Sequence, residues 1–149
     1  MGSISGCSVW GDGDCSTTDG TRLFVSNRRQ IWAVDAASCK WKRIATLPQR
    51  QFLWRSRPAV VLAGAPAERF SSFSQYGHCI EWHGGLLYIA GGELSDGWGD
   101  GPYLNSLQTF NEATGSWGDL PPMPHASKKA VSCVIGNQLF VAGGCNASR

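Results

Sequence analysis

The sequence predicts an all-β fold, and three observations support this prediction. The chain has 149 residues, of which 11% are aromatic and 19 are glycines. This combination is typical of short strands joined by tight turns. Two apolar runs, LLYIA at 86–90 and QLFVA at 138–142, each end on a Gly-Gly pair. Related segments recur elsewhere at regular spacing, which indicates a repeated β unit. The length favours a single compact region.

The repeat has two components. LLYIAGG at 86–92 aligns with QLFVAGG at 138–144, 52 residues later, and its first six residues also align with RLFVSN at 22–27. The second component, at 31–48, aligns with 107–124, 76 residues later, with a tryptophan inside each copy and a proline at its end. Three copies of one component and two of the other therefore alternate along the chain.

Each unit is predicted to contain four strands. The first lies around Cys79 to Trp82, or 131–135 in the last copy, and the second ends on the glycine pair. The third ends near Phe110, and the fourth starts at Trp117 after a hairpin in which Gly115 supplies the left-handed residue. Both faces of the second strand are apolar, as in a strand packed between two other sheets.

This pattern resembles the kelch repeat, which has Gly-Gly after its second strand, an aromatic residue in the third, and a tryptophan followed by a Leu-x-x-Met-Pro ending. The residues that carry the resemblance are Gly91, Gly92, Phe110, Trp117, Leu120, Met123 and Pro124. The 52-residue offset also agrees with the kelch period of about 50 residues. The resemblance implies a partial kelch-type β-propeller built from four-stranded antiparallel blades.

The resemblance divides the chain as a single kelch-repeat region. Residues 1–48 form a divergent first blade, 49–76 an insertion, 77–124 a second blade and 125–149 the start of a third. About two and a half blades are present, whereas closed propellers typically have about 4 to 8. We therefore expect an open arc with exposed apolar surface at Val131 to Val141, which needs further blades or self-association to complete a ring.

The first blade departs from the repeat at two turns. Asn27 and Arg28 replace the glycine pair, and Cys39 replaces the turn glycine of the hairpin. A left-handed Cys39 would cost about 1 to 2 kcal/mol, and the alternative is that this hairpin uses another turn.

Two insertions account for unequal spacing between the units. The longer one, at 49–76, contains a candidate extra strand at Ala59 to Leu62. The shorter one, Glu93 to Leu104, lengthens the connection between the second and third strands of the second blade, and we expect it to be a surface loop.

Composition argues against several classes of partner and location. A formal net charge of +2 gives no electrostatic case for nucleic acid or a membrane surface as partner. No apolar run approaches the ~20 residues of a membrane span, and the N-terminus lacks a secretory pattern, so the expected location is the cytoplasm. The six cysteines show no C-x-x-C pair, which predicts reduced thiols without zinc or disulfides.

No cofactor is expected. The glycine-rich stretch from Gly97 to Gly101 precedes no predicted helix, so it lacks the context of a phosphate-binding loop. His78 and His83 lie five residues apart, which aims them at opposite faces of a strand and argues against a shared metal. No Ser-His-Asp or paired-carboxylate arrangement stands out.

The resemblance implies a non-catalytic module that binds a protein or peptide on its blade loops, as a scaffold or a ubiquitin-ligase substrate adaptor. The alternative is a fragment of a kelch-like propeller enzyme of the sugar-acid mutarotase or oxidase type. An oxidase of this kind would be expected to have a secretion signal and tyrosine and histidine copper ligands, which are not found. The mutarotase alternative stays open.

The candidate binding residues follow from strand direction. Connections from second to third strands, and from fourth strands to the next unit, emerge at the same end because strands alternate in direction. Kelch proteins often contact ligands just after the glycine pair and just before the first strand, and the matching positions here are Arg29, Tyr76, Glu93 and Lys128. Large aromatic residues in polar loops are frequent interface anchors, which adds Trp54, Trp98 and Tyr103.

Overall fold

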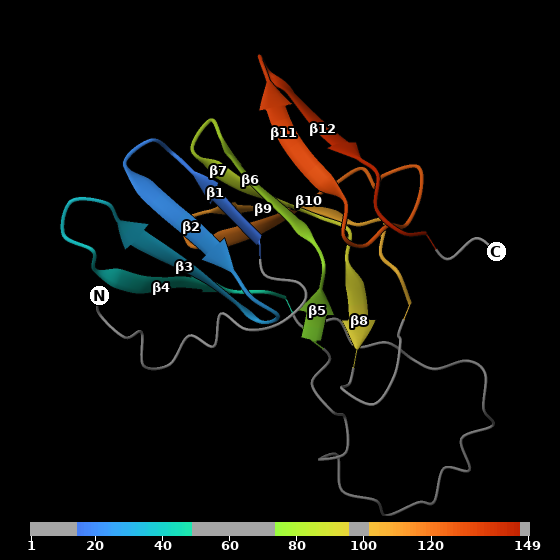
Figure 1. Cartoon of the computed structure of the whole chain (residues 1–149), viewed down its shortest axis with the longest axis horizontal. Coiled ribbons are helices and arrows are strands. Elements are labelled where there is room, and N and C mark those ends of the chain that lie inside the picture. The colour runs from blue at the N-terminus through green and yellow to red at the C-terminus, as the bar shows by residue number, and fades with distance from the viewer. Residues whose placement is uncertain (1–14, 49–73, 96–101, 147–149) are drawn as a thin grey trace, which may run out of the picture.

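The computed structural model describes residues 15–48, 74–95 and 102–146, and Figure 1 shows the arrangement of their strands. The described residues contain twelve strands, all paired antiparallel, and no helix. The predicted all-β class is therefore confirmed. No helix in this part of the chain is long and apolar enough to cross a membrane.

Two four-stranded sheets correspond to the two full copies of the repeat. The first sheet has the order β1 (Cys15–Thr18), β2 (Arg22–Ser26), β3 (Gln30–Asp35), β4 (Trp41–Thr46). The second has the order β6 (Cys79–His83), β7 (Leu86–Ala90), β9 (Leu107–Asn111), β10 (Ser116–Leu120). Both follow the predicted sequence of four strands. Short turns join successive strands within each sheet, except that residues 91–106, which include β8, connect β7 to β9.

Two shorter pairs complete the described structure. β11 (Val131–Ile135) and β12 (Gln138–Ala142) form a hairpin that matches the first two strands of the repeat. β5 (Ser74–Tyr76) pairs with β8 (Glu93–Ser95) at one end of the sheets, as Figure 1 shows. The sequence did not predict this second pair.

The first strands of the three units lie side by side. β1 contacts β6, and β6 contacts β11. Glu81 on β6 connects them, because its carboxylate accepts hydrogen bonds from Thr17 Oγ1 of β1 at 3.2 Å and from Ser132 Oγ of β11 at 2.8 Å. The two four-stranded sheets and the β11–β12 hairpin therefore follow one another in chain order, with their first strands adjacent.

The main core lies between the first and second sheets. Its buried members from the first unit are Phe24, Ile31, Ala33, Ala45 and Leu47, and those from the second are Ile80, Leu87, Ile89 and Phe110. Phe24 also stacks on Trp82, with ring centroids 4.9 Å apart. Burial of each large apolar side chain contributes about 1.5 to 3 kcal/mol, so this layer is the main source of cohesion between the sheets.

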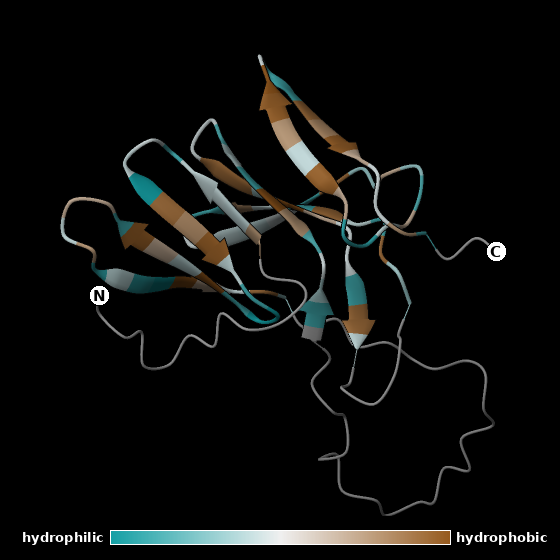
Figure 2. Ribbon diagram, in the orientation of Figure 1, coloured by the Kyte–Doolittle hydropathy of each residue, from teal (hydrophilic) through white to brown (hydrophobic). Residues whose placement is uncertain are grey.

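The β11–β12 hairpin carries apolar side chains at its surface. Val131 is 71% exposed, Ile135 63% and Phe140 45%, which confirms the predicted exposure of this segment. Figure 2 shows the same hairpin as a hydrophobic ribbon at the edge of the described structure. Its outward face therefore has no cover among the described residues.

The divergent turn at Cys39 adopts the same conformation as its glycine counterpart. Cys39 has φ 54° and donates its N–H to the Asp35 carbonyl at 2.8 Å, while Gly115 has φ 67° and donates to Asn111 at 2.8 Å. The alternative of a different turn is thus wrong. The Asp35 carboxylate holds the turn by accepting from both the backbone and hydroxyl of Ser38.

The connection from Glu93 to Leu104 differs from the predicted surface loop. Its first three residues form β8, and the side chains of Glu93, Leu94 and Leu104 are buried. A tertiary contact explains the difference, because β8 pairs with β5, which lies just before the first strand of the second sheet in the sequence. β5 also overlaps the end of the predicted 49–76 insertion. The candidate strand at Ala59 to Leu62 lies outside the described residues.

Candidate binding surface

The glycine pair after β7 allows three segments of backbone to meet. Gly91 N–H donates to the Ser106 carbonyl at 2.9 Å, and Gly92 N–H donates to the Ser127 carbonyl at 2.7 Å. A Cβ on Gly91 would lie 2.4 Å from the Ser127 carbonyl oxygen, and one on Gly92 would lie 2.6 Å from that of Tyr76. Both glycines also have positive φ, so the close approach requires glycine at this corner.

Glu93 and Lys128 form an ion pair beside this corner. Lys128 Nζ lies 2.5 Å from Glu93 Oε2, and Glu93 is only 5% exposed. The hydrogen bond to Glu93 raises the pKa of Lys128, because it stabilises the charged ammonium. The same ammonium lies 4.6 Å from the centroid of the Tyr103 ring, in cation–π geometry. Tyr103 is held in place by a β-bridge to Glu93.

Arg28 and Tyr76 form a second cation–π contact at the same end. The Arg28 guanidinium lies 4.1 Å from the centroid of the Tyr76 ring, and Tyr76 is paired with Glu93 across β5 and β8. The turn that carries Arg28 and Arg29 is shaped by Asn27, whose side-chain oxygen accepts the N–H groups of Arg29 and Gln30. The Gln75 N–H donates to the Arg28 carbonyl at 3.0 Å, which joins this turn to β5.

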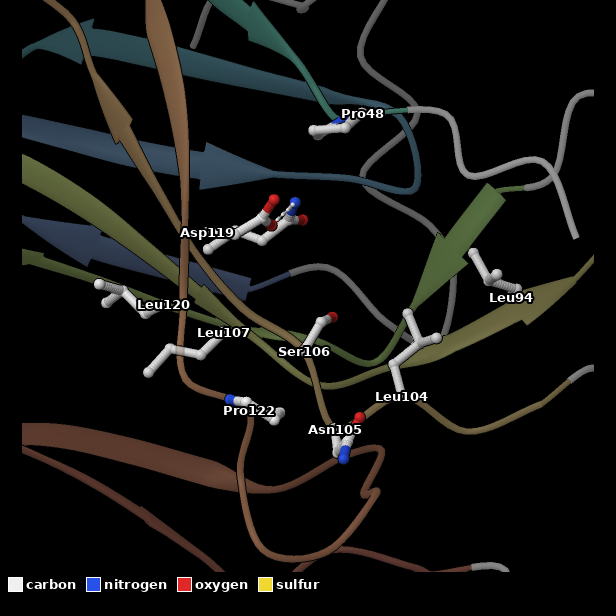
Figure 3. A pocket seen from close by; sticks show the side chains of 10 residues that line it. Pro48, Leu94, Leu104, Asn105, Ser106, Leu107, Asp119, Leu120 and Pro122 are labelled. Atoms are coloured by element: carbon white, nitrogen blue, oxygen red, sulfur yellow. Dashed lines mark hydrogen bonds between the residues drawn. The ribbon is translucent and has the colours of Figure 1, made fainter.

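A cleft of about 670 Å³ opens next to these contacts. Figure 3 shows its labelled side chains, which come from the segment after β4, from β8, from β9 and the residues just before it, and from β10 and the residues just after it. Its apolar lining residues are Pro48, Leu94, Leu104, Leu107, Leu120 and Pro122, and its polar ones are Asn105, Ser106, Gln108 and Asp119. Leu94 and Pro48 also border a recess lined by Arg28 and Arg29, so the cleft and the charged turn form one continuous surface.

The structure places five of the predicted binding residues at this end. Tyr76, Glu93, Tyr103 and Lys128 form one contacting cluster, and Arg29 lies on the neighbouring turn. Glu93 faces inward, whereas Arg29 is exposed and Tyr76, Tyr103 and Lys128 are half-buried. Trp54 and Trp98 lie outside the described residues.

Sequence reasoning missed three residues of this surface. Arg28 covers the Tyr76 ring, buried Gln75 donates its side-chain amide to the Gly91 carbonyl at 2.6 Å, and Leu94 lines the cleft. The 52-residue repeat offset could have indicated one feature of the cluster, the pairing of Tyr76 with Glu93. The offset aligns Tyr76 with Lys128 and Glu93 with Cys145, and each of the pairs Tyr76–Glu93 and Lys128–Cys145 forms a β-bridge.

The two histidines near β6 occupy separate environments. His78 is 3% exposed and its Nε2 lies 2.7 Å from Ser26 Oγ, while His83 Nε2 lies 2.7 Å from Asn137 Oδ1. Burial lowers the pKa of His78 to about 4, because desolvation disfavours the imidazolium. The described residues contain no group of three or more His, Cys, Asp or Glu side chains placed to hold a metal ion.

Comparison with known proteins identifies a fold likeness without a family assignment. No family model matches the sequence, and no curated protein matches it. The solved structure of YjhT has a similar fold, with a TM-score of 0.67 at 19% sequence identity. The similarity covers 93% of this chain and 36% of YjhT, so the chain spans about a third of the length of that protein.

Proposed function

We propose that this chain is part of a kelch-type β-propeller and that its sheets are blades. Two features support the proposal: the identical strand order of the two four-stranded sheets, and the side-by-side placement of β1, β6 and β11. In this proposal the described sheets form an open arc, which is completed by further blades or by self-association.

The proposed function is non-catalytic binding of a protein or peptide partner at the end that carries the β5–β8 pair. One observation carries this proposal: connections from three units converge there beside an open cleft of about 670 Å³. Connecting segments at one end of a rigid scaffold are a common location for binding residues. A scaffold or a cytoplasmic ubiquitin-ligase substrate adaptor would use such a surface.

The chemistry of the surface suits a peptide with apolar and acidic side chains. Leu107, Leu120 and Pro122, which are half-buried or exposed, offer apolar contacts inside the cleft. On the wall of the cleft, Gln108 Nε2 donates a hydrogen bond to Asp119 Oδ1 at 2.9 Å. Arg28 and Arg29, at the border, give this end positive charge, which favours a partner with carboxylates. The Glu93–Lys128 ion pair is internal to the protein, and we assign it the task of holding Tyr103 in position.

A displayed peptide library tests this proposal. Peptides selected on the wild-type chain are titrated against Arg29→Ala and against Leu120→Asp, which changes the lining of the cleft. We expect each variant to weaken binding by at least ~1 kcal/mol, which corresponds to about fivefold in Kd. Arg43→Ala is the matched control. Arg43 is an exposed arginine on β4 that lines neither the cleft nor the recess beside it.

Thermal melting of the same proteins distinguishes loss of contact from loss of structure. Arg29 is exposed and Leu120 is 38% exposed, so both variants should melt within a few degrees of wild type. If selected peptides bind both variants with unchanged affinity, the binding face lies elsewhere. If no peptide or protein ligand is selected and the chain instead turns over a small molecule, the non-catalytic function is wrong.

A further inference from the structure

Thr46 carries an exposed hydroxyl at the end of β4, the last strand of the first sheet. Within the described ranges, this hydroxyl has no hydrogen-bond partner. The hydroxyls of Thr17, Thr18 and Thr21 in the same unit, in contrast, all donate hydrogen bonds. Thr46 therefore presents to solvent an oxygen that the described fold does not use.

Two cations precede this hydroxyl at short spacing. Lys42 and Arg43 stand four and three residues before Thr46, and both are exposed. Arg43 pairs with Trp32 and Thr46 pairs with Gln30, so β4 has one more residue than β3 over this stretch, which is a β-bulge. Because the two partners on β3 are two residues apart, Arg43 and Thr46 lie on the same face of the sheet. Without the bulge, their odd spacing would put them on opposite faces.

An arginine three residues before a hydroxyl is the substrate pattern of basophilic protein kinases. Such kinases select substrates by charge, because carboxylates beside the kinase active site pair with the cations of the substrate. They bind the substrate segment in an extended conformation, which a β-strand already has. Strand ends also open locally at a lower free energy than the core of a sheet. The end of β4 therefore combines the charge pattern with access for a kinase.

Thr46 also lines the recess beside the candidate cleft, together with Arg28 and Arg29. The pairing of Thr46 with Gln30, and a hydrogen bond of 2.8 Å from Leu47 N–H to the Arg29 carbonyl, hold the end of β4 against this turn. The described lining of the recess contains these two arginines and no carboxylate. A phosphate on Thr46 would bring about 1.5 to 2 negative charges at pH 7, which would cancel most of the positive charge of the two arginines.

We propose that Thr46 is a phosphorylation site for a basophilic protein kinase, and that its phosphate weakens binding of acidic partners at the adjoining surface. The kinase transfers the γ-phosphoryl group of ATP. A bond forms between Thr46 Oγ1 and the γ-phosphorus, the bond to the β–γ bridging oxygen breaks, ADP leaves, and the hydroxyl proton passes to the catalytic base of the kinase. The effect on binding rests on the proposed function, because it acts through the positive charge that favours acidic partners. The modification itself does not rest on it.

Treatment of the folded chain with ATP and the catalytic subunit of cyclic-AMP-dependent protein kinase tests the modification. Mass-spectrometric mapping should find phosphate on Thr46, and it separates this site from Ser72, which follows Arg69 at the same spacing. We expect Arg43→Ala to slow incorporation at Thr46 at least tenfold, because the kinase loses its main charge contact. The matched control is Lys40→Ala, which removes an exposed cation just before β4 and should change the rate less than twofold.

A synthetic peptide of residues 40–48 shows whether the fold presents the site. The peptide contains Lys42, Arg43 and Thr46 and no other side-chain hydroxyl. We expect the folded chain to be modified at a rate within tenfold of the peptide, since the end of β4 opens locally. Far-UV circular dichroism before and after treatment checks that the chain stays folded. Modification of the peptide with no phosphate on Thr46 of the folded chain would overturn the proposal.

Titration of the phosphorylated chain tests the effect on binding. Acidic peptides selected on the unmodified chain should bind the phosphorylated chain at least fivefold more weakly. Arg43→Ala treated in parallel should keep wild-type affinity, because it stays unmodified and Arg43 lines neither the cleft nor the recess.

The outcomes separate the two parts of the proposal. Unchanged affinity of a chain with phosphate mapped to Thr46 would overturn the effect on binding. If no peptide is selected, the proposed function fails and the effect on binding fails with it, whereas phosphate mapped to Thr46 still confirms the modification site.

Discussion

Two residues other than glycine adopt left-handed backbone conformations within the described ranges. Cys39 has φ 54° and Lys129 has φ 56°. Each stands where another unit has glycine, because Cys39 aligns with Gly115 and Lys129 with Gly77, which have φ 67° and 57°. A side chain in this conformation costs about 1 to 2 kcal/mol relative to the right-handed region. The repeat therefore retains its turn geometry where its turn residue has changed.

The first prediction concerns this strain. Cys39→Gly should raise the free energy of unfolding by about 1 kcal/mol, because relief of the left-handed strain exceeds the added entropy of the unfolded chain. Urea denaturation measures the change. Gly115→Ala, at the equivalent turn with open space around its Cβ position, should lower stability by a similar amount. An unchanged midpoint for Cys39→Gly would show that the turn carries no strain.

The second prediction concerns His78. Its pKa is about 4 in the folded chain and 6.5 ordinarily, so the unfolded chain binds more protons between these values. Stability should therefore fall as pH drops from about 6.5 to about 4, by about 3 kcal/mol, and this contribution should level off below. Urea titrations across this range measure it. His78→Gln should remove most of that slope, while the control His83→Gln should retain it; an identical slope in both variants argues against this origin.

At the scale of the elements, the glycine pair after β7 determines how β5, β9 and the segment before β11 come together. Gly92→Ala should destabilise the chain by more than ~2 kcal/mol, since its Cβ would meet the Tyr76 carbonyl oxygen at 2.6 Å, and backbone cannot move aside at low cost. Gly84→Ala is the matched control, because Gly84 has φ 58° with nothing near its Cβ position. It should cost about 1 kcal/mol.

Thermal or urea unfolding compares these two glycine variants. Equal losses would mean that backbone conformation alone selects glycine after β7. A larger loss of stability for Gly92→Ala would show that the close approach of β5 also requires glycine at this position. It would also show that Gly92 allows Tyr76 to take its place in the candidate surface.

At the scale of the whole molecule, the exposed apolar face of the β11–β12 hairpin is unusual for a soluble monomer. Val131, Ile135 and Phe140 are 71%, 63% and 45% exposed on one hairpin. Contiguous apolar patches of this kind mark sites of association. In the proposed arc, this face would meet the next blade.

The purified chain should therefore bind a hydrophobic dye and self-associate in light scattering. Replacing Val131, Ile135 and Phe140 by lysine should reduce both signals and cost little stability, because exposed side chains away from special features usually contribute within ~0.5 kcal/mol each. A monomeric wild-type chain that binds no dye would contradict the open-arc proposal.

The strand content and the membership of the two main sheets could be predicted from the sequence. These features depend on local signals, namely two-residue alternation, the Gly115 turn, and the glycine pair that ends β7. The hairpin at Cys39 shows the limit of such signals. From the sequence alone, the cysteine allowed two different turns. Its φ of 54° and the hydrogen bond from its N–H to the Asp35 carbonyl decide between them.

The sequence by itself determined the all-β class, the four-strand unit, and the end of the molecule at which the candidate residues gather, since strand direction follows from chain order. Only the tertiary structure decided the β5–β8 pairing, the burial of Glu93, and its ion pair with Lys128, 35 residues away. The physical reason is that these contacts form between units, where stacking of the sheets brings distant connections together. Alternation along a strand specifies which face is buried, but it contains no information about which neighbour covers it.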